Sequence, residues 1–188
     1  MANVGIFLAD GFEEIEALTV VDILRRAQIE ITMISIMASK EITGAHGIKV
    51  MADAEYSEID FLKLDGIVLP GGMPGTLNLE KHSGVKEQIC AFAGENKLVA
   101  AICAAPSILG KAGLLQGKTA TCYPGIEEKL SGAVLSEKEV CVDGNIMTSK
   151  GMGTAIPFSL NLVEYFKGRE KADEISNSII YSKTLTEI

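Results

Sequence analysis

The stretch LVAAICAAP, from Leu98 to Pro106, constrains the fold of this chain more than any other. It starts with an uncharged apolar run whose length suits a strand buried on both faces. Cys103 stands where this run gives way to small residues and a proline. The pattern predicts a strand over 98–102, a sharp turn that carries the cysteine, and a helix over 107–112.

Cys103 is a candidate nucleophile because of this position. A strand–turn–helix places the side chain at the carboxyl edge of a parallel sheet, where the first amides of the next helix point at it. We therefore expect the thiol pKa to fall from about 8.5 towards neutrality or below. Position alone leaves a functional and a structural thiol equally open. The other cysteines, Cys90 on the apolar face of a helix and Cys122 and Cys141 in strands, are expected to be small core residues.

Strands and helices alternate along the rest of the chain. The hydrophobic periodicity predicts further strands over 3–8, 29–37, 66–69 and 119–122, and further helices over 13–27, 85–92 and 154–166. Shorter elements are expected at 47–51 (extended), 56–64 and 126–130 (helical turns), and 170–188 (a final helix or a loosely docked segment).

This alternation predicts an α/β fold with a doubly wound, mostly parallel sheet sandwiched by helices. Asp143-Gly144 lies between two short apolar runs, over 140–142 and 145–148, and predicts a hairpin that adds an antiparallel edge. No linker or internal repeat interrupts the 188 residues. We expect one domain over 1–188, which is long enough to bury a substantial core.

Composition excludes several classes of protein. The net charge of -8 argues against nucleic acid as the main partner. Asp10 breaks the first apolar stretch and no apolar run reaches about 18 residues, so we expect neither a signal peptide nor a membrane span. The four cysteines are scattered without a C-x-x-C pair, which argues against zinc and disulfides and favours a reducing cytoplasm.

No cofactor is expected either. The stretch AGLLQGKT over 112–119 resembles a phosphate-binding loop, but it follows a predicted helix and opens a strand, which is the wrong context. No dinucleotide-binding glycine fingerprint is present.

An acidic partner for the cysteine is offered by the first helix. Ile15 and Leu18 are expected to face the core and Glu13 to point away, whereas Glu16 lies next to the apolar face and can tilt into a crevice. A carboxyl placed there would have a raised pKa and could donate a proton to a thiolate. Glu16 is therefore the candidate general acid/base.

Loops at the carboxyl ends of three predicted strands should meet in that crevice, namely Asp10-Gly11, GGMPG over 71–75, and the Cys103 turn. The glycines of GGMPG either let backbone amides approach a ligand or make a tight turn and nothing more.

These motifs together resemble a known family. ADGFEEIE, VLPGGMPG, AAICAAPSIL, the Asp143-Gly144 hairpin and TSKGMGT stand in the order and spacing of the ThiJ/PfpI superfamily, and the chain is similar to its DJ-one (Parkinson-protein, YajL-like) branch from Asn3 to about Gly168. The resemblance implies a flavodoxin-like sandwich, a homodimer and a nucleophile-elbow cysteine with an acidic partner.

The resemblance also implies roles for individual residues. Cys103 matches the reactive cysteine, and Glu16 matches the protonated glutamate that hydrogen-bonds its sulfur. The amides of Gly72 and Ala104 match an oxyanion-binding pair. Gly71, Tyr123 and His46 are candidate pocket residues.

Two departures from the family pattern narrow the chemistry. Peptidase-like members carry a histidine where this chain has Ala104, and some members of the closer branch carry one where it has Tyr123. A Cys-His mechanism therefore lacks its base. Proton transfer falls to Glu16, with Tyr123 or water as an aid.

By resemblance, the expected function is a cofactor-free hydratase or lyase of the glyoxalase III kind, which converts methylglyoxal to lactate, or a deglycase that repairs glycated protein or nucleotide. The partner would be a small reactive carbonyl. The main alternative is a redox-sensing stress-response protein or chaperone with an oxidisable Cys103. A thiazole monophosphate biosynthesis protein, which is a family label, and an intracellular cysteine peptidase are lesser alternatives.

Overall fold

A mostly parallel sheet lies at the centre of the computed structural model, which describes residues 2–181. Within these residues the sheet has seven strands in the order β10-β11-β7-β6-β1-β2-β5. The neighbouring strands run parallel except for the β10–β11 hairpin at one edge. The predicted sheet and its antiparallel edge are therefore confirmed. The strands are β1 Asn3–Leu8, β2 Glu30–Ser35, β5 Ala54–Glu55, β6 Gly66–Leu69, β7 Leu98–Ile102, β10 Val140–Asp143 and β11 Ile146–Ser149.

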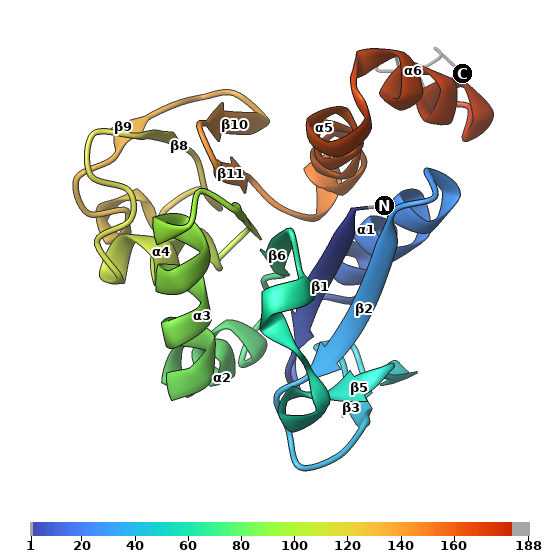
Figure 1. Ribbon diagram of the computed structural model, residues 1–188. Helices are drawn as coiled ribbons and strands as arrows, with labels where there is room; N and C mark the ends of the chain where they lie inside the picture. Colours follow the sequence, from blue (N-terminus) through green and yellow to red (C-terminus); the bar gives the residue numbers. More distant parts are fainter. Residues whose placement is uncertain (1, 182–188) are drawn as a thin grey trace.

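Helices cover both faces of the sheet (Figure 1). Because side chains alternate along a strand, β7 sends Leu98, Ala100 and Ile102 into one core and Val99 and Ala101 into the other. One face is covered by α1 Glu14–Arg26, α5 Ala155–Lys167 and α6 Arg169–Ser178, and the other by α2 Gly75–Lys81, α3 Ser83–Gly94 and α4 Pro106–Lys111.

Two small two-stranded sheets and several 3₁₀-helical turns lie outside the central sheet. The predicted extended piece at 47–51 is β4 Lys49–Met51, which pairs antiparallel with β3 Glu41–Thr43. The predicted strand at 119–122 is shorter than expected, as β8 Thr119–Ala120, and pairs with β9 Val134–Leu135 outside the central sheet. The 3₁₀-helical turns are Tyr56–Glu58, Phe61–Lys63, Glu127–Lys129 and Met152–Thr154.

Two apolar side chains differ from their predicted positions, and so does Glu13, which is predicted to point away from the core but has a side chain that is only 14% exposed. Cys90 is exposed because the buried face of α3 is centred on Val85, Ile89 and Phe92, and Cys90 lies off it. Ile15 is 50% exposed, whereas the acids on either side of it are buried. Both predictions assumed that an apolar side chain faces the core, but the rotation of each helix decides which residues do.

The remaining sequence predictions concern membrane spans and the C-terminal tail. Among the described residues, the helices are too short or too polar to cross a bilayer. The predicted tail over 170–188 begins as α6, and its last residues, 182–188, lie outside the described part, as does Met1.

Candidate active site

Cys103 occupies the sharp turn that the sequence predicts. Its φ of +66° lies in the left-handed region, which costs a residue other than glycine about 1 kcal/mol or more. Two neighbouring segments hold this conformation: the Cys103 amide donates to the Ser149 carbonyl at 3.0 Å, and the Cys103 carbonyl accepts from the Tyr123 amide at 2.8 Å. The turn lifts the side chain away from β7 and towards the loops beside it.

Glu16 reaches the same place from the first turn of α1. It is 1% exposed, and its Oε2 accepts a hydrogen bond from the Gly71 amide at 2.8 Å. Oε1 is buried and has no partner with good hydrogen-bond geometry among residues 2–181. The carboxyl interacts with the thiol of Cys103, so the structure brings the predicted pair together.

The electrostatics of the pair differ from the sequence prediction. Burial raises the pKa of Glu16 to about 7. Burial, followed by the charge of Glu16, raises the pKa of Cys103 to about 12, although the amides of Ala104 and Gly72 hydrogen-bond the sulfur and act in the opposite direction. The expected fall in the thiol pKa is therefore wrong, because the amides are present but burial outweighs them.

A thiol of this kind is activated by its partner rather than by its own acidity. Near pH 7, Glu16 exchanges its proton readily, and its carboxylate can accept the thiol proton as the sulfur attacks. Loss of one proton from the pair leaves the negative charge mainly on the carboxyl, because its pKa lies far below that of the thiol.

Glycine backbone forms two walls of the site. A Cβ on Gly71 would lie 2.8 Å from Glu16 Oε2 and 3.1 Å from Cys103 Sγ. A Cβ on Gly151 would lie 3.8 Å from Glu16 Oε1 and 3.9 Å from Cys103 Sγ. Side chains at these two positions would therefore crowd the sulfur and the carboxyl.

The predicted meeting of three loops is confirmed. Gly71 accepts a hydrogen bond from the Glu13 amide at 2.9 Å, and Gly11 accepts one from the Gly75 amide at 3.0 Å. Gly72 has a φ of +92°, and a Cβ there would lie 2.3 Å from the Glu13 nitrogen. Asp10 turns away, and its carboxylate accepts from the Thr43 amide.

The remaining candidate pocket residues lie at different distances from the sulfur. Tyr123 is 54% exposed, and its ring lies beside Gly151, which places it at the rim. His46 packs instead against Glu13 and Glu14. Sequence reasoning did not single out Gly151, although it lies in the TSKGMGT motif.

Residues 2–165 match the model of the DJ-1/PfpI family. The chain belongs to the DJ-1/PfpI family. It is 41% identical to Protein DJ-1 homolog A of Arabidopsis thaliana over 176 residues, which cover 92% of this chain and 45% of that protein. It is 34% identical to the Parkinson disease protein 7 homolog of Danio rerio over 179 residues, with coverages of 93% and 95%.

A solved structure from the DJ-1/PfpI family supports the fold. Toxoplasma gondii DJ-1, in an oxidized form, matches with a TM-score of 0.93 at 34% identity, covering 97% of this chain and 100% of that chain. This match confirms the flavodoxin-like fold expected from the family motifs.

The chain spans less than half the length of the two Arabidopsis relatives it matches.

The pH dependence of alkylation tests the coupling between Cys103 and Glu16. The rate at which iodoacetamide modifies Cys103 should rise as the pH increases through about 7, because Glu16 then loses its proton and can accept that of the thiol. In Glu16→Gln the rise centred near pH 7 should vanish, because the neutral amide cannot accept the thiol proton.

Peptide mass spectrometry measures this rate for each cysteine separately. Cys90, which is exposed, serves as the internal reference and should react alike in both proteins. A profile for Cys103 that is the same in Glu16→Gln would contradict the coupling.

Proposed function

We propose that this chain is a cofactor-free enzyme that converts small dicarbonyls such as methylglyoxal to hydroxy acids, in the manner of a glyoxalase III. The observation that supports it most is the thiol of Cys103, which has two backbone amides directed at it and a carboxyl of pKa about 7 beside it. This set supplies a nucleophile, an oxyanion site and a proton carrier without a metal or cofactor.

The first step is addition of sulfur to the aldehyde carbon of methylglyoxal. Glu16 accepts the thiol proton, and the amides of Gly72 and Ala104 are suited to stabilise the oxyanion of the resulting hemithioacetal. Protonation of that oxygen completes the addition.

The second step is an internal transfer of reducing equivalents. Glu16 carries the proton from the first carbon to the second, and the hydroxyl proton on the first carbon passes to the oxygen of the second, so that the first carbon becomes a thioester and the second an alcohol. Water then cleaves the thioester, which releases lactate and restores the thiol. The sum is methylglyoxal plus water to lactic acid. Adducts on protein or nucleotide would present the same carbonyl chemistry on a larger molecule.

Lactate production from methylglyoxal by the pure protein tests this proposal. Cys103→Ser should lose about a thousandfold or more of the turnover, because it removes the nucleophile. Glu16→Gln should lose about a hundredfold, because it keeps an acceptor for the Gly71 amide but cannot carry a proton. Turnover of the unaltered protein should increase with pH through about 7.

Cys90→Ser is the matched control and should retain full turnover, since Cys90 is exposed on α3. Unchanged turnover in Cys103→Ser or in Glu16→Gln would refute the scheme.

Peptidase activity finds less support, because a Cys-His mechanism needs a histidine beside the nucleophile. Ala104 follows Cys103, and both histidines have other partners: His82 accepts a hydrogen bond from the Val85 amide at the start of α3, and His46 lies against Glu14. Biosynthesis of a thiazole phosphate also lacks support, because the phosphate-loop-like stretch over 112–119 is not in a strand–loop–helix context.

A redox-sensing role is favoured by one specific observation. Glu16 Oε1 is buried beside the thiol without a hydrogen-bond partner among the described residues. When protonated, it could donate to an oxygen added to the sulfur. Oxidation of the thiol by two equivalents of peroxide would give a sulfinic acid and two waters. The structure of the Toxoplasma relative is of an oxidized form, which is consistent with this alternative.

Mass spectrometry after mild peroxide treatment separates this role from random oxidation. We expect a gain of two oxygens at Cys103 in the unaltered protein and a gain that is at least several-fold smaller in Glu16→Asp, whose shorter side chain cannot reach the added oxygen. Equal oxidation of all four cysteines, or an equal gain in Glu16→Asp, would count against tuned sensing.

We also propose that the chain forms a homodimer, which the family resemblance implies. Two apolar side chains are about half exposed: Ile15 on α1 and Ile48 in the turn between β3 and β4. The Ile48 amide donates a hydrogen bond to Glu14, which precedes Ile15, so the turn lies against the start of α1. Apolar side chains so placed would gain from burial against a second copy.

Sedimentation velocity tests the dimer. Ile15→Asp should shift the protein to the monomer, because it would bury a charge in the interface. Leu62→Asp, at a residue 81% exposed on a separate 3₁₀ turn, should leave the dimer intact. A monomeric parent protein would rule the proposal out.

A further inference from the structure

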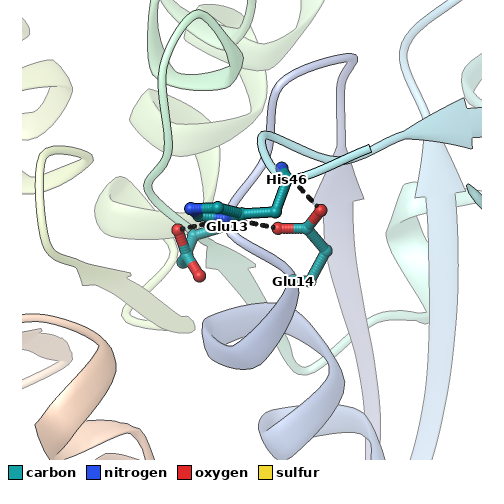
Figure 2. Close-up of side chains that lie close together, drawn as sticks. All are labelled: Glu13, Glu14 and His46. Carbon is teal, nitrogen blue, oxygen red and sulfur yellow. Dashed lines mark hydrogen bonds and ion pairs between the residues drawn. The ribbon is translucent and has the colours of Figure 1, made fainter. Parts of the chain in front are cut away.

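A second cluster of chemically reactive side chains lies at the start of α1. Glu14 is the first residue of α1 and Glu13 is its N-cap, whereas His46 comes from the turn between β3 and β4, 32 residues further along the chain than Glu14. Figure 2 shows the two carboxyl groups and the imidazole ring directed towards one another. One ligand atom from each residue lies within 4.8 Å of the others.

The distances within this cluster fit a metal ion. His46 Nδ1 lies 3.0 Å from Glu14 Oε2 and 3.6 Å from Glu13 Oε2. With metal–ligand bonds of about 2.0–2.2 Å, two ligands of a tetrahedral zinc ion are about 3.3–3.6 Å apart. The distance from His46 Nδ1 to each carboxylate oxygen is therefore within a few tenths of an ångström of this range, and the three atoms lie within 4.8 Å of one another.

Glu14 is oriented for this task by the backbone. Its side chain is 4% exposed, and Oε1 accepts hydrogen bonds from the amides of His46 and Ile48 at 2.8 and 3.3 Å. These two bonds fix the carboxylate and leave Oε2 facing the imidazole ring. Outer hydrogen bonds of this kind orient ligands in metal sites.

Glu13 provides an independent reason to look for a cation. Its side chain is 14% exposed, yet among residues 2–181 its carboxylate accepts no hydrogen bond and its ion-pair partner is the His46 ring at 3.6 Å. A carboxylate that is largely removed from water needs a cation or a donor close by. The ring serves Glu14 at the shorter distance, so Glu13 is poorly compensated.

We propose that Glu13 Oε2, Glu14 Oε2 and His46 Nδ1 form a binding site for a divalent first-row metal ion such as Zn²⁺. One imidazole and two carboxylates suit zinc better than calcium or magnesium, which prefer oxygen alone. The site uses neither Cys103 nor Glu16, so it stands or falls independently of the proposed enzymatic activity. Water would supply the fourth ligand.

Proton balance is straightforward. The ring binds the ion through Nδ1 in its neutral form and keeps a proton on Nε2, so any proton on Nδ1 passes to solvent when the ion binds. The Nδ1–H···Oε2 hydrogen bond to Glu14 is then replaced by two bonds to the ion.

Titration calorimetry with Zn²⁺ tests the site. The parent for this experiment is the full chain with Cys90→Ser and Cys103→Ser, because these two thiols are not fully buried and would bind zinc themselves. We expect one equivalent of zinc per chain. His46→Ala and Glu13→Gln should each weaken binding by about tenfold or more, since each removes one ligand.

His82→Asn is the matched control, because it removes the other histidine while keeping an acceptor at the start of α3. It should bind zinc as the parent does. No binding by the parent, or undiminished binding by His46→Ala or Glu13→Gln, overturns the proposal.

Cobalt provides a second readout that reports the ligands themselves. Co²⁺ bound by one nitrogen and two carboxylate oxygens with water should show the strong visible bands of a four-coordinate ion, without the near-ultraviolet band of a thiolate ligand. These bands should disappear in His46→Ala. A thiolate band, or bands that survive in His46→Ala, would assign the metal to another place in the chain and refute this site.

Discussion

The buried contact between the Glu16 carboxyl and the Cys103 thiol is the constraint on which the rest of this structure depends. Burial raises the carboxyl pKa from 4.5 to about 7. A group whose folded pKa is raised stabilises the fold below its unfolded pKa, and this stability is lost as the pH rises through the folded value. Holding Glu16 ionised above pH 7 thus costs about 3 kcal/mol, which the surrounding packing must offset.

The parallel sheet provides that packing and also brings the loops together. The carboxyl ends of β1, β6 and β7 are adjacent, so the segments after them meet at one edge. All three segments need a backbone conformation with positive φ, at Gly11, Gly72 and Cys103. The conformation of Cys103 is stabilised by the hydrogen bond that its amide donates to the Ser149 carbonyl and by the one that its carbonyl accepts from the Tyr123 amide, and these two residues belong to two further segments. The site is rigid because five parts of the chain share it.

Three acids at the start of α1 have three different environments. Glu16 faces the thiol and is best placed to carry protons. Glu14 is satisfied by the turn that carries His46. Glu13 lies between them and is held by its amide to Gly71. A helix N-terminus favours negative charge at all three positions, so this preference does not distinguish among them. Their different roles arise from the different segments of the chain that contact each side chain.

Much of this protein is determined by its sequence alone. The alternating apolar runs predict the α/β fold and most of its strands and helices, and the Asp143-Gly144 turn predicts the antiparallel edge. Placement at strand ends, together with the family motifs, predicts Cys103, Glu16, Gly72 and Ala104. These features depend on residues within a few positions of one another, which a local pattern can represent.

The tertiary structure decided what depends on contacts between distant segments. It reversed the expected shift of the Cys103 pKa, because burial and the nearby carboxyl outweigh the amides at the turn. It exposed Ile15 and Cys90, since the rotation of a helix against the sheet selects its buried face. It also brought His46 to Glu13 and Glu14. Desolvation and long-range pairing are properties of the packed molecule, and no short stretch of sequence contains them.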